Sequence, residues 1–180
     1  MKKIDEWYNK LCDRASDIKE HLPILREYAR RVDSIVEMGV RWGNSTAALI
    51  AGRPKVMTSY DLGKHKVFNL DGYRNMAEEV GVKYDFVEAD VLEVLIEPID
   101  LLFIDTYHSY SQLSQELKLH GNKSNRYIIF HDTVTFGNIG MDGKKPGLNQ
   151  AINEFIKENP HWFIKEVYIN NNGLTVLERK

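Results

Sequence analysis

Hydrophobic and polar positions follow two different periods along the chain. Near the N-terminus, apolar residues recur at helical spacing, as at Leu22, Leu25 and Tyr28, which predicts helices in the first 31 residues. Short apolar runs follow and predict strands at 32–39, 55–63, 83–90, 99–105, 127–132, 162–169 and 174–179. Helical patterns lie between them at 44–52, 71–81, 109–121 and 148–159, and Asn44 or Ser45 is the expected N-cap of the first.

Strands that alternate with helices, joined by crossovers too long for hairpins, are typical of an α/β fold with a parallel sheet covered on both faces. The last two strands flank the sequence NNNG at 170–173, which is a hairpin signal. We therefore predict a Rossmann-like, seven-stranded, mostly parallel sheet that ends in an antiparallel hairpin. A length of 180 residues predicts a single domain, with a helical cap at 1–31 and a Rossmann-like core at 32–180.

Composition narrows the function classes without naming one. With 43% hydrophobic and 28% charged residues, the chain has the make-up of an ordinary globular protein. A net charge of -2 argues against a surface built for nucleic acid. The lone Cys12 excludes an intramolecular disulfide and a cysteine-based metal site. No apolar run has the length of a signal peptide or a membrane span, so we expect a cytoplasmic protein without a membrane partner.

Two of the predicted strands stop on ionisable residues. The run IDLLFIDTYH ends its apolar part at Asp105, with His108 three residues later, and the run RYIIFHDT ends on His131 and Asp132. In a parallel sheet, ligands bind beyond the carboxyl ends of the strands, which meet at one edge. Three further predicted strands end at or near an acidic residue, namely Glu37, Asp61 and Asp90. Together these strand ends predict an active-site crevice.

The segment EMGVRWGNS at 37–45 joins the first strand to its helix. Gly39 would allow a tight turn, and Gly43 would let a ligand approach the helix start, where free N–H groups favour anions. Asp61 follows at the distance expected of a residue that binds ribose hydroxyls. The spacing is not that of a GxGxxG motif, and the alternative is a plain strand–helix turn with an incidental glycine pair. Because Glu37 is acidic, the turn suits a cationic ligand better than a pyrophosphate.

Taken together, these motifs resemble the class I S-adenosylmethionine-dependent methyltransferases. The likeness is greatest to the small branch related to sugar and macrolide O-methyltransferases and cephalosporin hydroxylase-like proteins. It rests on E-x-G-x-x-x-G-x-S at 37–45, YDLG at 60–63, DLLFIDTYHSY at 100–110, IIFHDT at 128–133 and NNGLTVLER at 171–179. The resemblance implies S-adenosylmethionine as cofactor. By this resemblance, Glu37 and Gly39 would contact the methionine part of the cofactor, and Asp61 its ribose. Asp90 or Ala89 would lie near the adenine ring. Gly43 and Ser45 would also belong to the binding loop.

The resemblance also implies roles at the later strand ends. Asp105, His131 and Asp132 occupy the positions that hold a magnesium ion in the metal-dependent members, and His108 matches a general base. The chain departs from that pattern at His131, where those enzymes carry an acidic residue. Imidazole is a poor ligand for magnesium and a good one for iron, manganese or zinc. A metal-free site with His108 or His131 as the base therefore stays open, as do simpler roles for these residues in capping, in backbone contacts or in solvent.

The acceptor is expected at the long, glycine-containing stretch 133–147, because loops of this length are usually functional. Lys144 and Lys145 would suit an anionic acceptor, or else form a solvated tip. The remaining histidines have no partner at ligand spacing and are expected at the surface, namely His21, His65, His120 and His161.

The favoured function is an O-methyltransferase that acts on a small hydroxylated acceptor such as a sugar, with or without a divalent metal. Two alternatives remain, an iron-dependent oxygenase and a non-catalytic module that binds S-adenosylmethionine. No nucleic-acid partner is expected. The acceptor, the metal and the oligomeric state, including a homodimer, are left open by the sequence.

Overall fold

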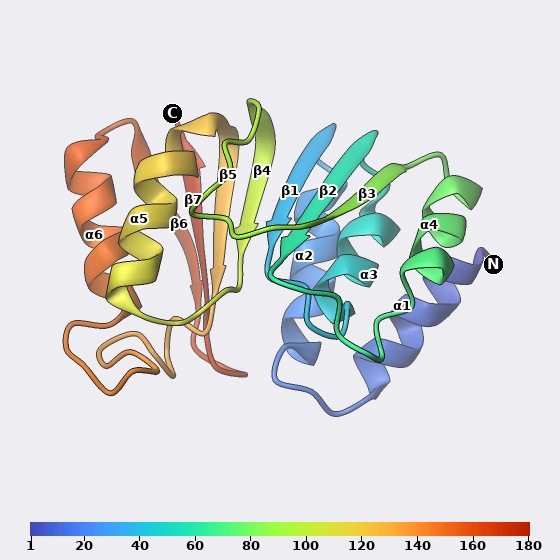
Figure 1. Cartoon of the computed structure of the whole chain (residues 1–180), viewed down its shortest axis with the longest axis horizontal. Helices are drawn as coiled ribbons and strands as arrows, with labels where there is room; N and C mark the ends of the chain where they lie inside the picture. Colours follow the sequence, from blue (N-terminus) through green and yellow to red (C-terminus); the bar gives the residue numbers. More distant parts are fainter. The chain divides into compact units, whose positions relative to one another are not determined.

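The computed structural model describes residues 1–180 and contains seven strands. The contacts of the chain divide it into a first unit, Met1–Asp90, and a second unit, Val91–Lys180. Each unit carries part of the strand set and its own helices (Figure 1). The predicted single domain with a cap at 1–31 and a core at 32–180 stays a prediction.

The first unit contains three parallel strands, β1 (Ser34–Met38), β2 (Val56–Asp61) and β3 (Lys83–Glu88). In their register Glu37 lies opposite Ser59, and Asp61 lies opposite Glu88. The helices are α1 (Lys3–Asp13), α2 (Leu22–Ala29), α3 (Asn44–Gly52) and α4 (Leu70–Glu79), with a 3₁₀ turn η1 at Lys19–His21. The carboxyl ends of β1 and β2 thus deliver Glu37 and Asp61 next to the start of α3.

Helices α1 and α2 both pack against α3. The contact between α2 and α3 depends on Gly52, because a Cβ atom there would lie 2.3 Å from the Cβ of Ala29. The N-cap of α3 is Gly43, so the prediction of Asn44 or Ser45 as N-cap is wrong. The left-handed residue after the helix is Arg53, with φ 65°. Gly52 therefore serves the close packing of two helices.

The second unit contains four strands, β4 (Ile99–Ile104), β5 (Ser124–His131), β6 (Trp162–Tyr168) and β7 (Leu174–Arg179). Strands β4 and β5 are parallel, while β7 is antiparallel to both β5 and β6. Helix α5 (Tyr110–His120) continues into a 3₁₀ turn η2 at Gly121–Lys123, and α6 (Leu148–Glu158) packs beside α5 (Figure 1). Strand β5 buries every residue from Tyr127 to His131.

The turn between β6 and β7 has the conformation that its sequence predicts. Asn171 and Asn172 have φ angles of 44° and 72°, and the amide of Gly173 donates to the carbonyl of Asn170 at 2.8 Å. Asparagine and glycine adopt such left-handed angles at little cost. The antiparallel C-terminal hairpin is confirmed, as are the seven mostly parallel strands. No helix in the structure has the length and apolar character needed to cross a membrane.

The prediction that His21 and His120 lie at the surface is wrong. Both side chains are fully buried, and Nε2 of His120 lies 2.7 Å from the carbonyl oxygen of Val91. His120 follows Leu113 by seven residues and therefore falls on the inward face of α5. A polar residue in the inward register was mistaken for a surface position.

Candidate active site

The turn between β1 and α3, which we call the glycine loop (37–45), is held by the end of β2. The amide of Gly39 donates to the carbonyl of Tyr60 at 2.8 Å. The Asp61 carboxylate accepts on Oδ2 from the amides of Val40 at 2.8 Å and Arg41 at 3.0 Å. Carboxylate bonds to backbone amides are stronger than neutral ones. Asp61 therefore fixes the shape of the glycine loop, a role that the sequence did not reveal.

Gly43 is needed for both backbone and packing reasons. Its φ is 82°, and a Cβ atom there would lie 2.8 Å from the ring of Phe68 and from the hydroxyl of Tyr73. That hydroxyl donates to the carbonyl of Gly43 at 2.8 Å and accepts from the indole N–H of Trp7 at 2.9 Å. The space freed by Gly43 is therefore occupied by the protein's own aromatic rings.

Glu37 is fully buried at the end of β1. Its Oε2 accepts from Ser59 Oγ at 2.6 Å and from Thr46 Oγ1 at 2.8 Å. These bonds tie β1 to β2 and to the first turn of α3, where Ser45 is also buried. Asp90 is half-buried two residues beyond Glu88, the partner of Asp61 in the sheet register. The predicted cofactor residues thus belong to one region of the first unit, and their contacts with a cofactor stay predictions.

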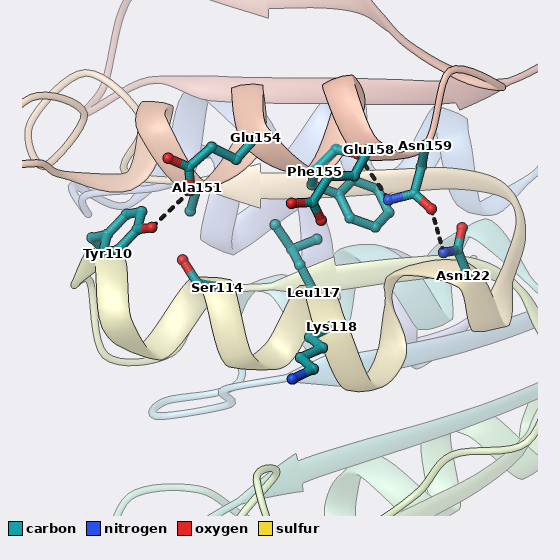
Figure 2. A pocket seen from close by; sticks show the side chains of 10 residues that line it. All are labelled: Tyr110, Ser114, Leu117, Lys118, Asn122, Ala151, Glu154, Phe155, Glu158 and Asn159. Carbon is teal, nitrogen blue, oxygen red and sulfur yellow. Dashed lines mark hydrogen bonds between the residues drawn. The ribbon is translucent and has the colours of Figure 1, made fainter.

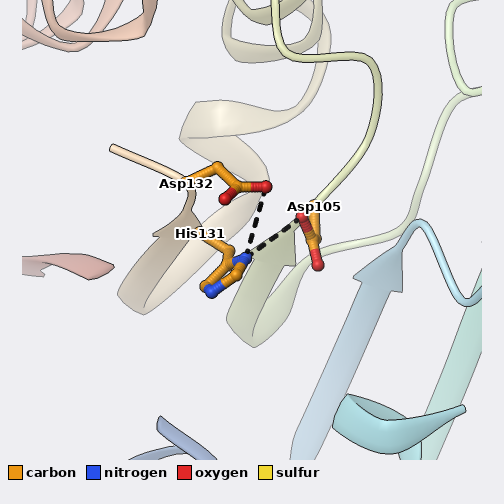
Figure 3. A group of neighbouring side chains, drawn as sticks. All are labelled: Asp105, His131 and Asp132. Carbon is orange, nitrogen blue, oxygen red and sulfur yellow. Dashed lines mark ion pairs between the residues drawn. The ribbon is translucent and has the colours of Figure 1, made fainter. Parts of the chain in front are cut away.

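The ends of β4 and β5 bring four ionisable side chains together in what we call the strand-end cluster, Asp105, His108, His131 and Asp132. Nε2 of His108 lies 3.0 Å from Oδ1 of Asp105 and 2.9 Å from Oδ2 of Asp132. Nδ1 of His131 lies 3.5 Å from the same two oxygens. In Figure 3 the two carboxylates converge on this ring nitrogen. Parallel strands therefore do unite these residues, as the sequence predicted.

The two carboxylates and the two imidazoles shift each other's proton affinities. Burial alone would lower the pKa of His108, but its bonds to Asp105 and Asp132 outweigh burial and raise the pKa from 6.5 to about 9. By the same balance the pKa of His131 rises to about 10. Burial opposes ionisation of the aspartates, yet the histidines hold the pKa of Asp105 and of Asp132 below the ordinary value of 3.8. Without a further cation, both histidines are therefore protonated at neutral pH.

The backbone after β5 supports this arrangement. Asp132 has a φ of 61°, a left-handed angle that few non-glycine residues adopt. The amide of Phe136 donates to the carbonyl of Asp132 at 2.9 Å, and the Phe136 ring stacks on His108 with centroids 5.0 Å apart. The carbonyl of His108 in turn accepts from the amide of Met141 at 2.7 Å. The loop 133–147 therefore covers His108 and fixes its ring.

The strand-end cluster fits a divalent cation. One ligand atom each of Asp105, His131 and Asp132 lies within 4.8 Å of the others. Oδ1 of Asp132 is buried and has no hydrogen-bond partner, which is costly for a carboxylate oxygen unless something else binds it. Two carboxylates and one imidazole suit manganese, iron or zinc better than magnesium. The residues present are thus compatible with the metal site that the motifs implied.

A separate groove of about 580 Å³ runs between α5 and α6. Across it the Tyr110 hydroxyl donates to Glu154 at 2.7 Å, and Asn122 donates to Asn159 at 2.7 Å (Figure 2). None of the strand-end cluster residues lines this groove. Tyr110, the first residue of α5, lies at one end of the groove (Figure 2).

Two residues near the cluster were missed by the sequence interpretation, Phe136 and Glu116. Phe136 gave no signal, because nothing in a loop sequence indicates which ring will stack on a histidine. Glu116 did give one: it is fully buried and lies three residues after Leu113 on the inward stripe of α5. A carboxylate in that register is unusual in a helix that packs on a sheet.

Comparison with solved structures shows which fold the chain has. No protein-family model and no curated protein matches the sequence. Among solved structures, a methyltransferase from Podospora anserina bound to SAH is 18% identical and has a TM-score of 0.66, with 98% of this chain and 87% of that chain covered. An O-methyltransferase from Bacillus cereus in complex with SAH is also 18% identical, with a TM-score of 0.63 and 100% and 92% of the two chains covered.

A third similar structure is that of an enzyme named as a nitrogen methyltransferase. It is the 1,6-didemethyltoxoflavin-N1-methyltransferase from Burkholderia thailandensis with 1,6-didemethyltoxoflavin and SAH bound. It is 13% identical, with a TM-score of 0.64, and 92% of this chain and 79% of that chain are covered. The chain therefore has the Rossmann-like fold of the methyltransferases, as the motifs predicted. The fold alone does not distinguish oxygen from nitrogen acceptors.

Proposed function

We propose that the protein is an S-adenosylmethionine-dependent methyltransferase that acts on a hydroxyl group of a small acceptor. The observation that carries the proposal is the strand-end cluster, because it joins two carboxylates to a histidine in a chain with the methyltransferase fold. Cofactors bound in the similar structures support S-adenosylmethionine as the methyl donor.

The cofactor belongs to the first unit in this proposal. The glycine loop meets its methionine part, and Asp61 meets the ribose with the carboxylate oxygen that does not hold Val40 and Arg41. An acidic residue at the end of the second strand can bind both ribose hydroxyls. Because Asp61 also shapes the loop, binding and loop geometry depend on the same side chain.

The second unit supplies acceptor activation. His108 accepts the hydroxyl proton at Nε2, and the electron pair of the acceptor oxygen forms the bond to the methyl carbon. The carbon–sulfur bond of the donor breaks, and its electron pair remains on sulfur. A neutral imidazole is required, whereas the pKa of about 9 keeps His108 protonated when Asp105 and Asp132 face only histidines. The proposed mechanism therefore needs a positively charged partner for the two carboxylates, so that they no longer raise the pKa of His108.

Asp105, His131 and Asp132 would hold a divalent cation, which would supply a Lewis acid for the acceptor hydroxyl. Since the bonds to the two carboxylates are what raise the pKa of His108, sharing those carboxylates with a cation would favour the neutral imidazole, which can take the proton. Phe136 keeps the His108 ring in place and shields one of its faces from water.

An iron-dependent oxygenase is the second candidate. One observation favours it: two imidazole nitrogens and two carboxylates meet within 3.5 Å in the strand-end cluster. Such a set resembles the two-histidine, one-carboxylate sites of non-haem iron enzymes. Oxygen consumption by the iron-loaded protein, with no S-adenosylmethionine bound, would favour this function over methyl transfer.

The test is formation of S-adenosylhomocysteine by the full-length protein over sugar, catechol and nitrogen-heterocycle acceptors. Each acceptor is tried with Mg²⁺, with Mn²⁺ and with a chelator. Acceptor-dependent product supports the proposal, and calorimetry that detects no binding of S-adenosylmethionine contradicts it. Full activity in the presence of chelator would exclude a role for the cation and leave a mechanism based on histidine alone.

The role of His108 is tested by His108→Gln, which retains a polar side chain without a proton acceptor of suitable pKa. We expect turnover to fall by roughly 10²–10⁴, the usual range for a positioned base. His161→Gln is the matched control, because Nε2 of His161 lies 3.0 Å from Asn122 and His161 is not part of the strand-end cluster. Equal turnover in the two variants would exclude His108 as the base.

A further inference from the structure

Strand β6 (Trp162–Tyr168) is the last strand of the sheet and pairs with β7 alone. Its outer edge therefore faces no other strand of this chain. An exposed strand edge is a template for pairing with a further strand, and natural proteins usually protect it with charged side chains or bulges. An edge that lacks such protection would therefore indicate a partner strand.

Apolar side chains are exposed along β6. Ile164 and Val167 are 45% and 55% exposed, and Ile169, just beyond the strand, is 79% exposed. In the register with β7, Ile164 lies opposite Leu177 and Val167 lies opposite Thr175. Because those two β7 residues are two apart, they point to the same face of the sheet. Ile164 and Val167 therefore share one face, and we call them the edge stripe.

The two features that usually protect an edge do not cover the edge stripe. Nζ of Lys165, the one lysine of β6, donates to Oε2 of Glu178 on β7 at 2.6 Å, so its charge is neutralised within the chain. The bulge lies between Ile164 and Glu166, in the middle of the strand. On either side of it, the segments 162–164 and 166–168 pair with β7 in an unbroken register. Each half of β6 therefore keeps a regular edge.

The residue types of β6 are symmetric about the peptide bond between Lys165 and Glu166, which carry opposite charges. The next residue outward on either side is β-branched and belongs to the edge stripe, and the one after that is aromatic, Phe163 or Tyr168. The aromatic residues lie opposite β7 residues that are four apart, so both point to the face away from the edge stripe. The order of residue types and faces is therefore the same when β6 is read backwards.

We propose that β6 forms a homodimer interface, in which it pairs antiparallel with β6 of a second copy about a two-fold axis between Lys165 and Glu166. Ile164 then lies opposite Val167 of the second copy, and Lys165 lies opposite Glu166 of the second copy. Residues that face each other share a face of the sheet, as antiparallel pairing requires, and the charged pair has opposite signs. The two-fold axis forms each contact twice. A strand from another protein would need the same symmetric order of residue types, which a second copy has by construction.

The proposed interface is small, because each copy contributes one short strand. We therefore expect a reversible dimer whose fraction rises with protein concentration. The strand-end cluster lies on β4 and β5, and β7 separates these strands from β6. The inference therefore does not depend on methyl transfer, and either can fail without the other.

Sedimentation velocity of the full-length protein over a concentration series tests the dimer. We expect Val167→Lys to shift the wild-type equilibrium to monomer, because it places a lysine opposite Ile164 of the second copy at two symmetric points. Leu95→Lys is the matched control, because Leu95 is 71% exposed and precedes β4, which β5 and β7 separate from β6. A wild-type protein that stays monomeric throughout, or an equal shift in the two variants, would overturn the inference.

Disulfide formation tests the register itself, in a Cys12→Ser background. Ile164→Cys combined with Val167→Cys should give a disulfide-linked dimer on mild oxidation, because Cα atoms of directly opposite residues lie about 4.5–5.5 Å apart, within reach of a disulfide. Ile164→Cys alone is the control, because the two copies of residue 164 would be three residues out of register, roughly 10 Å apart. A double variant that does not crosslink, or a single variant that crosslinks equally well, would overturn the inference.

Discussion

The glycine loop with Asp61 and the strand-end cluster both place carboxylates at the ends of parallel strands, but the carboxylates have different partners. In the first unit, Asp61 bonds to the amides of Val40 and Arg41, and Glu37 bonds to two hydroxyls. In the second unit, Asp105 and Asp132 face two imidazoles instead. One set is held by neutral donors of the chain and the other by groups that can lose a proton.

This difference agrees with the two proposed roles, cofactor binding in the first unit and acceptor activation in the second. A carboxylate that accepts from backbone amides fixes the fold around it, so its removal changes the shape of the loop. A carboxylate paired with an imidazole can exchange that partner for a cation or a proton while the backbone stays in place. Variants in the two regions should therefore fail in different ways: loop variants in binding and stability, cluster variants in turnover.

Asp132→Asn should give the largest effect. Asparagine tolerates the left-handed angle of residue 132, so the variant removes the charge and keeps the backbone. We expect methyl transfer to be abolished, a loss at or beyond the upper end of the roughly 10²–10⁴ range for positioned acid–base groups. The Kd for S-adenosylmethionine should stay unchanged.

Turnover and calorimetry on the same Asp132→Asn preparation check this. Asp100→Asn is the control, because Asp100 lies at the opposite end of β4 from Asp105. If cofactor affinity falls together with turnover in Asp132→Asn, the separation between the two regions is lost.

Gly43→Ala should be the most destabilising change in the glycine loop. The left-handed φ costs an alanine about 1–2 kcal/mol, and the clash with Phe68 and Tyr73 adds about 1–3 kcal/mol of overpacking. Gly81→Ala is the control, because Gly81 has a φ of 78° and nothing within 4 Å of an added Cβ. Denaturant unfolding gives both free energies, and equal losses would mean that the packing at Gly43 contributes nothing.

Asp61→Ala should weaken S-adenosylmethionine binding by about 1–3 kcal/mol, the cost of unpaired hydrogen-bonding groups. It should also lower the thermal midpoint, because the amides of Val40 and Arg41 lose their acceptor. Asp33→Ala is the control, since Asp33 forms an exposed ion pair with Lys55 and such pairs contribute little. A thermal midpoint equal to that of the control would show that the glycine loop holds its shape without Asp61.

The smallest effect concerns the pH dependence of stability in the metal-free protein. The raised pKa values of His108 and His131 contribute stability that is complete below their ordinary 6.5 and is lost as pH rises through about 9 and about 10. The lowered pKa values of Asp105 and Asp132 contribute stability that is complete above 3.8 and is lost on acidification. Stability from the cluster should therefore be greatest between these limits.

Thermal unfolding in chelator as a function of pH measures this directly. The alkaline decline should be shallower in His131→Asn than in the wild-type protein, because one of the two shifted imidazoles is gone. An unchanged alkaline decline would mean that His131 does not carry a raised pKa.

The ends of β4 and β5 and the mostly parallel character of the sheet were predictable, because apolar runs and their periods can be recognised in the sequence. The apolar runs that end at Asp105 and at His131 are typical of parallel strands in this order of elements, and the carboxyl ends of parallel strands meet at one edge of the sheet. Element boundaries were less certain: β3 ends at Glu88, where the sequence interpretation extended it to Asp90. The interior of a turn has no period, so the N-cap at Gly43 was missed as well.

The contacts of individual side-chain atoms could not be predicted from the sequence. The two amides on Oδ2 of Asp61 and the aromatic rings around Gly43 depend on how the glycine loop folds back. The pKa of His108 depends on two carboxylates from different strands at 3.0 and 2.9 Å. Glu116 was within reach, because a three- and four-residue spacing from Leu113 to Leu117 marks the inward stripe of α5.

The left-handed backbone at Asp132 also bears on how this protein can evolve. Asparagine and glycine are the residues that best share this conformation with aspartate, and a single nucleotide change converts an aspartate codon into either. If Asp132 is catalytic, as proposed, its carboxylate can therefore be lost by genetic drift without loss of the fold. Inactive descendants that still bind the cofactor would be expected to carry Asn or Gly at this position, so its identity in a lineage would mark where catalysis gave way to binding.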